Sequence, residues 1–137
     1  MPTSLKEMLA TANAEVPRVP PAEAKALIER GNTLVVDVRD GAELQSGGKI
    51  KGAVHVPRGM LEFRADPESP YFKEEFASGK KLLLYCASGG RSALAAQRLQ
   101  EMGLERVAHV VGGLKAWKEG NGPLELLTGS STVDGNR

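Results

Sequence analysis

The stretch that decides the fold is LLLYCASGGRS, residues 82–92. It opens with an apolar run, which is typical of a strand buried on both faces of a parallel sheet. It continues through Cys86 and the pair Gly89-Gly90 into a segment with helical periodicity that starts near Ser92. Because ligands of open parallel sheets bind at the carboxyl ends of the strands, we expect Cys86 at the mouth of a crevice.

On both sides of this stretch, strand patterns alternate with helix patterns. Apolar runs predict strands at residues 33–38, 53–56, 81–85 and 107–111. Apolar residues at helical spacing predict helices at residues 4–14, at 24–28 with an end at Gly31, and at 92–102. Strands separated by helices of about ten residues usually pair in parallel. The sequence therefore predicts an α/β domain of three layers, with a mostly parallel central sheet and helices on both faces.

The composition changes near both ends of the chain. A capping box at Ser4 starts the predicted N-terminal amphipathic helix, which we interpret as an appendage over residues 1–15. The last residues are mostly Gly, Ser, Thr and Asn, so residues 126–137 are predicted to form a flexible tail. The domain itself then spans residues 16–125. Within it, residues 59–79 combine prolines, aromatic residues and mixed charge, which favours a long connection with one or two short helices.

The charge balance argues against several classes of function. Lys and Arg number 18 against 17 Asp and Glu, so no net field favours binding to nucleic acid or to an anionic membrane. The longest apolar run, residues 82–87, is short of the roughly 20 residues of a membrane span. Lys6 and Glu7 interrupt any signal-peptide core, and we expect a cytoplasmic protein.

The cysteine and histidine content bears on metals and disulfides. Cys86 is the only cysteine, which excludes an internal disulfide and a cysteine-based zinc site. His55 and His109 lie inside predicted strands without metal-ligand spacing, so structural roles are expected for both. The sequence predicts no metal and no cofactor.

The loop after the central strand has the composition of an anion-binding turn. Two consecutive glycines allow backbone N–H groups to curl inward, and the start of a helix adds partial positive charge. These features and the Arg91 guanidinium favour the thiolate form of a cysteine, so Cys86 is a candidate nucleophile. A buried structural cysteine, the alternative, leaves the glycine pair and Arg91 unexplained. The candidate substrate-binding residues of the loop are Ala87, Ser88, Gly89, Gly90, Arg91 and Ser92.

The sequence resembles the single-domain rhodaneses, which are sulfurtransferases of the rhodanese-like fold, over residues 16–125. The segments that carry the resemblance are LVVDVRD at 34–40, GGKIKGAVHVPRG at 47–59, LLLYCASGGRS at 82–92 and VGGLKAWKEG at 111–120. The resemblance implies that Cys86 takes the outer sulfur of a donor such as thiosulfate and becomes a persulfide. It also implies transfer to a thiophilic acceptor such as cyanide or a thiol, with loop N–H groups around the persulfide and Arg91 on the anionic donor.

Three further charged residues are candidates for the site. Asp37 and Arg39 end a predicted strand with their side chains on one face, and in the family the matching residues support the active loop. The alternative for this pair is a structural ion pair between strand and helix. Arg58 follows Pro57 at another strand end and either gathers anionic donors or is a solvated loop charge.

Other functions compete with this hypothesis. A sulfur-relay module would use the same cysteine but take sulfur from a protein persulfide or a polysulfide. A phosphatase or arsenate reductase of this fold is less favoured, because the related phosphatase loops place five residues between Cys and Arg, where this chain has four. A non-catalytic interaction domain does not explain Cys86 and Arg91. The expected partners are a small anionic sulfur donor and a thiophilic acceptor, with a protein thiol as one candidate.

Overall fold

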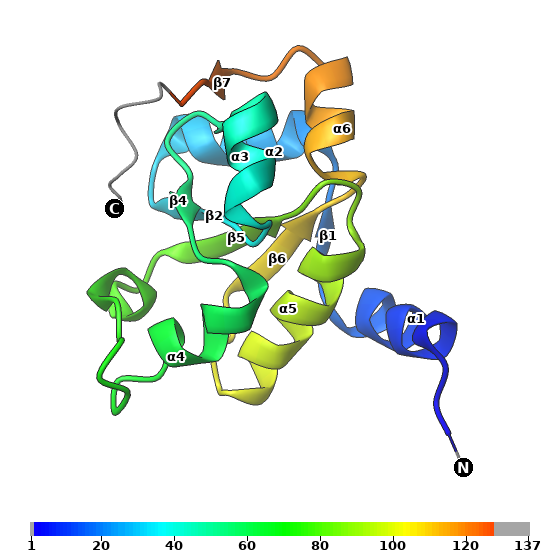
Figure 1. The fold of residues 1–137 in the computed structure, drawn as a ribbon, viewed down its shortest axis with the longest axis vertical. Coiled ribbons are helices and arrows are strands. Elements are labelled where there is room, and N and C mark those ends of the chain that lie inside the picture. The colour runs from blue at the N-terminus through cyan, green and yellow to red at the C-terminus, as the bar shows by residue number, and fades with distance from the viewer. Residues whose placement is uncertain (1, 128–137) are drawn as a thin grey trace.

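The structure, a computed structural model, describes residues 2–127 and is built around one parallel sheet (Figure 1). The five strands lie in the order β1-β6-β5-β2-β4, and every neighbouring pair is parallel. The strands are β1 (Arg18–Val19), β2 (Thr33–Asp37), β4 (Val54–His55), β5 (Lys81–Tyr85) and β6 (Val107–Val110). This arrangement confirms the predicted mostly parallel central sheet.

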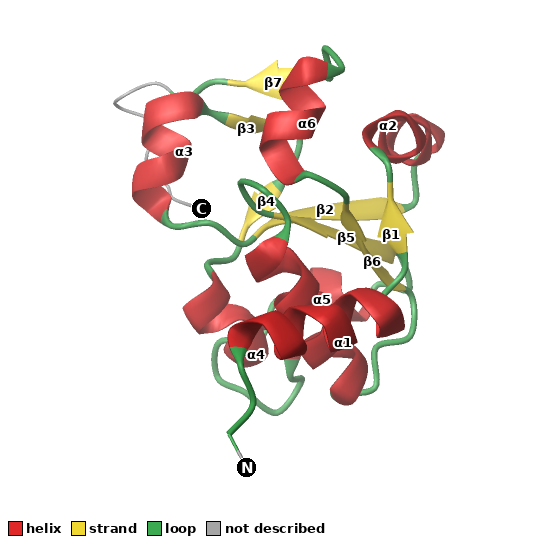
Figure 2. Ribbon diagram, turned by 90° about the vertical axis from the view of Figure 1, so that its right-hand side faces the viewer, coloured by secondary structure: helices red, strands yellow, loops and turns green. Residues whose placement is uncertain are grey.

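Helices cover both faces of the sheet (Figure 2). The face that packs against α5 (Gly90–Glu101) is also covered by α1 (Leu5–Glu15) and α4 (Leu61–Ala65). The opposite face carries α2 (Pro21–Arg30) and α6 (Gly113–Glu119), with α3 (Gly41–Gly47) beside them. A two-stranded antiparallel sheet of β3 (Lys49–Ile50) and β7 (Leu124–Glu125) lies next to α6. The predicted three layers are confirmed.

Alternate residues of the central strands supply the two cores. The core shared with α4 and α5 contains Leu34, Val36, Leu82 and Leu84. The core shared with α2 and α6 contains Val35, Leu83 and Tyr85. Such continuous apolar runs are expected where a strand is covered on both faces, and the alternation fixes which side chains point toward each layer.

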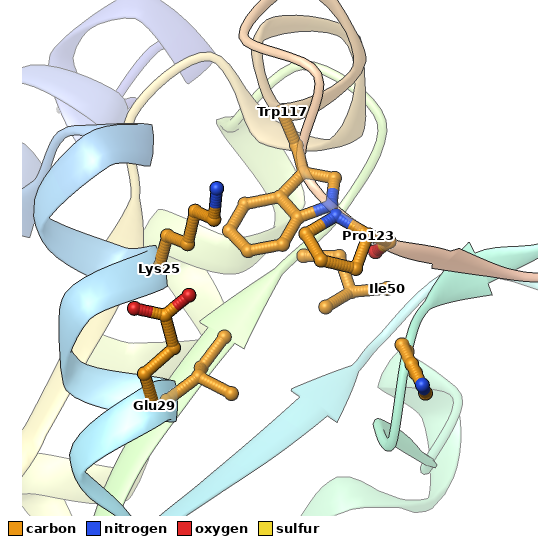
Figure 3. A pocket seen from close by; sticks show the side chains of 7 residues that line it. Lys25, Glu29, Ile50, Trp117 and Pro123 are labelled. Atoms are coloured by element: carbon orange, nitrogen blue, oxygen red, sulfur yellow. The ribbon is translucent and has the colours of Figure 1, made fainter.

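The indole of Trp117 closes the second core from the side of α6. It is 2% exposed, and its Nε1–H donates to the carbonyl of Pro123 at 2.9 Å. Figure 3 shows the ring between α2, which carries Lys25 and Glu29, and the segment of Pro123. Trp117 is thus a packing residue that joins α6 to the small sheet.

The N-terminal helix begins where the sequence predicts. The Ser4 hydroxyl accepts the Glu7 N–H at 3.0 Å, and the Glu7 carboxylate accepts the Ser4 N–H at 2.9 Å. The helix packs against α5 through Ala12, which is fully buried, whereas Leu5 and Met8 are 58% and 43% exposed. Only part of the predicted apolar face is therefore covered by the domain.

Several short elements escaped the sequence prediction. Strands β1, β3 and β7 have two residues each, which is too short for any alternation to register. Helix α3 has a single buried residue, Leu44, and begins where the Glu43 carboxylate accepts the Asp40 N–H at 3.1 Å. It is stabilised by its cap more than by an apolar face.

The remaining predictions concern the long connection and the tail. The connection at 59–79, predicted to hold one or two short helices, holds α4 and the 3-10 turn η2 (Glu74–Ala77), and α4 is preceded by a further 3-10 turn, η1 (Arg58–Met60). Most of the predicted tail, residues 128–137, lies outside the described residues. Among the helices of residues 2–127, none has both the length and the hydropathy that crossing a membrane requires.

Candidate active site

Cys86 directly follows β5 and starts a turn whose later N–H groups point back to the Cys86 sulfur. The residue is 1% exposed. Its Sγ accepts the Gly89 N–H at 3.1 Å and the Ser92 N–H at 3.4 Å, and lies 3.5 Å from the Ser92 Oγ. Gly89 has φ of 114°, a left-handed conformation that permits this turn and caps α5. The sulfur therefore lies where negative charge is stabilised by N–H groups and by the start of a 12-residue helix.

Four more N–H groups of the loop are available to a ligand. Within residues 2–127, these backbone groups donate to no protein acceptor; they belong to Ala87, Ser88, Gly90 and Arg91. Unpaired donors next to a helix N-terminus form an anion-binding cup. The loop can thus surround a second sulfur atom or an oxyanion attached to Cys86.

The start of α6 holds the loop from the other side. The N–H of Leu114 donates to the Cys86 carbonyl at 2.8 Å, and that of Lys115 donates to the Ala87 carbonyl at 3.1 Å. Gly113 makes this approach feasible, because a Cβ there would lie 2.5 Å from the Cys86 carbonyl oxygen and its φ is 60°. Gly113 is therefore needed for a close contact between the backbones of α6 and the loop.

Arg91 is engaged by a residue that the sequence did not single out. Its Nη1 and Nη2 donate to the two carboxylate oxygens of Glu43, at 2.7 and 2.9 Å. These hydrogen bonds lower the pKa of Glu43 to about 2 and raise the pKa of Arg91. The Arg91 side chain is 40% exposed, so the pair lies at the protein surface beside the loop. Glu43 of α3 thereby fixes the position of the cation.

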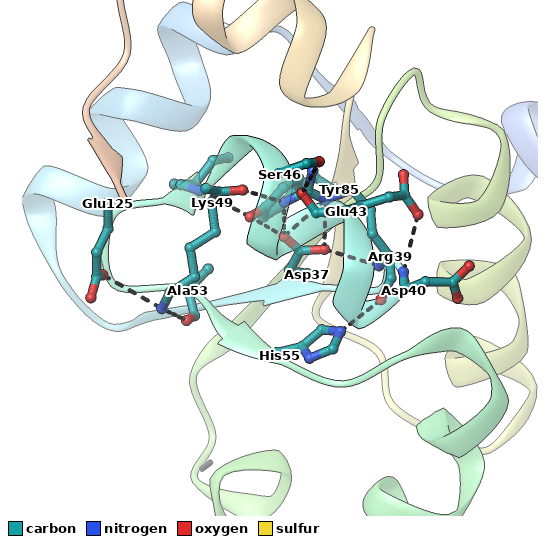
Figure 4. Close-up of polar contacts among 12 residues, drawn as sticks. Asp37, Arg39, Asp40, Glu43, Ser46, Lys49, Ala53, His55, Tyr85 and Glu125 are labelled. Carbon is teal, nitrogen blue, oxygen red and sulfur yellow. Dashed lines mark hydrogen bonds and ion pairs between the residues drawn. The ribbon is translucent and has the colours of Figure 1, made fainter. Parts of the chain in front are cut away.

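Asp37 and Arg39 form a buried network behind the loop (Figure 4). The Arg39 Nε donates to the Asp37 Oδ1 at 3.0 Å, and Nη2 donates to Oδ2 at 2.8 Å and to the Gly48 carbonyl at 2.6 Å. The Tyr85 hydroxyl donates to the Asp37 Oδ2 at 2.5 Å and accepts the Ile50 N–H at 3.0 Å. The network thus ties the end of β2 to Tyr85, which precedes Cys86, and to the segment that follows α3.

Arg58 has contacts away from the loop. Its guanidinium pairs with Glu62 at 2.9 Å, and its N–H donates to the carbonyl of Val38. With Met8 and Leu94, its side chain lines a groove between α1 and α5. The hydrogen bonds of the described chain therefore link Arg58 to α4 and to the residue that follows β2, and none of them links it to the loop that contains Cys86.

The Rhodanese-like domain family matches residues 20–120. The chain belongs to this family. Helix α1 (Leu5–Glu15) precedes the matched range.

Individual relatives support the assignment of this rhodanese-like chain. Rhodanese-like domain-containing protein 9, chloroplastic, of Arabidopsis thaliana is 34% identical over 134 residues, with 78% of this chain and 57% of that protein covered. The chain spans about half the length of the first curated relatives that it matches.

Two solved structures that are similar to this rhodanese-like chain have descriptions that name different activities. A Rhodopseudomonas palustris protein of unknown function, described as a possible tyrosine phosphatase, has a TM-score of 0.86 and 45% identity, with 91% of this chain and 99% of that chain covered. The human single-domain sulfurtransferase TSTD1 has a TM-score of 0.64 and 26% identity, with 76% of this chain and 96% of that chain covered.

Two residues near the rhodanese-like loop were missed as site residues. Glu43 gave no signal beyond its place in a helix start, and its partner Arg91 is 48 residues away. His109 of β6 is 2% exposed, and its Nδ1 lies 3.0 Å from the Ser92 Oγ. A polar residue at an inward-facing strand position always requires a partner, and this rule is the signal that could have drawn attention to His109.

Proposed function

We propose that this protein is a sulfurtransferase that carries sulfane sulfur as a persulfide on Cys86. The donor is an anionic compound such as thiosulfate, and the acceptor is a thiophile such as cyanide or a thiol. The observation that carries the proposal is the cup around the Cys86 Sγ: two N–H groups already reach the sulfur, at 3.1 and 3.4 Å. The other N–H groups of the turn, which has four residues between Cys86 and Arg91, can donate to an added sulfur.

The reaction consists of two displacements at sulfur. The Cys86 thiolate attacks the outer sulfur of thiosulfate, a new S–S bond forms, and sulfite leaves with the electron pair of the broken bond. The acceptor nucleophile then attacks the outer sulfur of the persulfide, and Cys86 leaves as the thiolate. Loop N–H groups stabilise the negative charge in both steps because they are fixed before the reaction starts.

Intact-mass measurement without reductant tests this function. Treatment with thiosulfate is expected to add the mass of one sulfur atom, and cyanide is expected to remove it with formation of thiocyanate. A protein that gains no sulfur from thiosulfate, a polysulfide or a low-molecular-weight persulfide would contradict the proposal.

A sulfur-relay module is the second candidate, and the pairing of Arg91 favours it. Both terminal nitrogens of Arg91 are already bound to Glu43, so an anionic donor has to compete with a carboxylate. A neutral or protein-bound persulfide has no such competitor. Loading from a protein persulfide at a much higher rate than from thiosulfate would favour the relay. The cytoplasm suits either reaction, because its thiols stay reduced.

Replacement of Arg91 is expected to weaken donor binding. Arg91→Ala removes a charge-assisted contact, so the KM for thiosulfate should rise about tenfold, which corresponds to about 1.4 kcal/mol. Arg91→Lys should restore only part of the affinity because it lacks the guanidinium fork. Arg98→Ala is the matched control, since Arg98 lies on the same helix but pairs with Glu101 at the surface. Steady-state kinetics with thiosulfate and cyanide measure both values, and an unchanged KM in Arg91→Ala would contradict the assigned role.

Phosphatase activity is expected to be absent. Hydrolysis of a phosphate monoester needs an acid that protonates the leaving oxygen, and the carboxyl group paired at the loop, Glu43, has a pKa of about 2. It is ionised at neutral pH and held by Arg91, so it cannot donate that proton. Wild-type protein should therefore hydrolyse aryl phosphates no faster than the buffer. Robust hydrolysis that disappears in Cys86→Ser would replace the sulfurtransferase proposal with a phosphatase.

A further inference from the structure

A line of polar side chains connects Cys86 with the N-terminal helix. Behind the sulfur lies the Ser92 hydroxyl, at 3.5 Å, and behind Ser92 lies the Nδ1 of His109, at 3.0 Å. The Nε2 of His109 lies 3.2 Å from the Oδ1 of Asn13 on α1. Ser92 is fully buried and His109 is 2% exposed, so protein groups alone satisfy the inner part of the line.

The imidazole in this line is neutral at physiological pH. Burial, and then the positive charge of Arg18, lower the pKa of His109 to about 4. A neutral imidazole has one N–H and one lone pair, so it donates at one end and accepts at the other. The tautomer of His109 therefore decides whether Nδ1 accepts the Ser92 O–H or leaves it free to donate to another acceptor.

The Ser92 Oγ also lies 3.3 Å from the Gly89 carbonyl, so its O–H has three acceptors within reach, and two arrangements of the line involve the sulfur. In the first, Nε2–H donates to the Asn13 Oδ1, and Nδ1 accepts the Ser92 O–H, so the serine oxygen is free to accept the S–H of a thiol. In the second, the Asn13 amide turns over and donates to Nε2, Nδ1–H donates to the Ser92 oxygen, and the Ser92 O–H donates to a thiolate. The distances of 3.5, 3.0 and 3.2 Å allow both.

We propose that His109, held by Asn13, is a positioning residue that directs the Ser92 hydroxyl proton toward the Cys86 sulfur when this sulfur is negatively charged. The inference rests on the proposed sulfurtransferase function and deepens it. When cyanide attacks the outer sulfur of the persulfide anion, the S–S bond breaks and thiocyanate and the Cys86 thiolate form. The Ser92 hydroxyl then donates to that leaving thiolate. In the Nδ1–H tautomer this step transfers no proton, because the Ser92 O–H only turns from the Gly89 carbonyl, 3.3 Å away, to the thiolate.

Other charges also face these groups and have to be kept constant. On the side of the sulfur these are Arg91 of α5 and its partner Glu43 of α3. On the side of the imidazole it is Arg18 of β1. The variants below leave all three in place.

The rate of Cys86 alkylation by iodoacetamide as a function of pH tests the inference. Between about pH 6 and 10 the imidazole stays neutral, so the change of rate with pH reports the fraction of Cys86 in the thiolate form. Ser92→Ala should raise the pH at which the alkylation rate is half-maximal by about one unit, because the thiolate loses one hydrogen bond. His109→Phe, which keeps a planar aromatic ring but removes both nitrogens, should cause a similar shift. The double variant should resemble Ser92→Ala, because His109 acts only through Ser92. Additive shifts, or no shift in His109→Phe, would overturn the inference.

Asn13→Ala separates this role from a general effect of the N-terminal helix. Asn13 is partly exposed on α1, so the variant keeps the fold, and its profile should move in the same direction by a smaller amount. Gln97→Ala is the matched control, because the Gln97 Nε2 donates to Glu15 of α1 at 2.9 Å, outside the line. An equal shift in both variants would assign the effect to docking of α1 and contradict the inference.

The alkylation assay needs no sulfur donor, so the two proposals can fail independently. Shifted profiles in a protein that gains no sulfur would support the line from Asn13 to Cys86 and contradict the sulfurtransferase function. Normal sulfur loading with unshifted profiles would support the sulfurtransferase function and contradict the role of the line from Asn13 to Cys86.

Discussion

Cys86→Ser protein is expected to gain no sulfur from thiosulfate and to lose thiocyanate formation by more than about a thousandfold. A serine hydroxyl has a far higher pKa than a thiol, is a poor nucleophile toward sulfur, and forms no stable bond to sulfane sulfur under these conditions. The side chain is buried at 1% exposure and the two residues are nearly equal in shape. Intact-mass measurement after thiosulfate treatment detects the missing adduct directly.

The fold of this variant should persist, which makes the result specific to the chemistry. The serine oxygen can accept the Gly89 N–H that the sulfur accepts in the wild type, at 3.1 Å. Thermal unfolding and circular dichroism of Cys86→Ser should therefore stay close to those of the wild type. A sulfur adduct or residual turnover in the folded variant would rule out a persulfide on Cys86.

The sequence was sufficient for the parts of the fold that depend on local patterns. Strands β2 and β5 are continuous apolar runs covered on both faces, and the burial of Val36 and Leu84 shows why their periodicity was informative. The turn after β5 was predictable as well, because only glycine adopts φ of 114° at Gly89 without strain. Patterns of this kind involve neighbours in the chain and need no knowledge of tertiary contacts.

The missed residues depend on contacts between distant segments. Glu43 meets Arg91 across 48 residues, and Asn13 meets His109 across 96 residues. No spacing rule connects such positions, because each pairing arises only after β6 and the helices have been placed on the sheet. The same limit applies to β3 and β7, which form strands only because Ile50 and Leu124 pair with each other.

Asp37→Asn is expected to lower the free energy of unfolding by about 3–5 kcal/mol. The substitution keeps the shape of the side chain but leaves the Arg39 guanidinium, whose side chain is 4% exposed, without its counter-charge. A buried cation cannot be compensated by solvent, and the Gly48 carbonyl at 2.6 Å is a dipole only. Urea denaturation of the wild type and the variant measures the difference.

Graded variants show whether the charge or the hydrogen bonds cause the loss. Tyr85→Phe removes the hydroxyl that bridges Asp37 and the Ile50 N–H, and should cost about 1–3 kcal/mol because one buried donor remains unpaired. Glu101→Gln breaks the exposed pair with Arg98, and should cost less than about 1 kcal/mol. If Asp37→Asn proves no more costly than Glu101→Gln, the network does not stabilise the strand ends through its charges. If instead the loss of unfolding free energy falls in the order Asp37→Asn, Tyr85→Phe, Glu101→Gln, burial of the unpaired Arg39 charge is the dominant cost. The stability of the ends of β2 and β5 then depends on Tyr85, the residue that precedes Cys86.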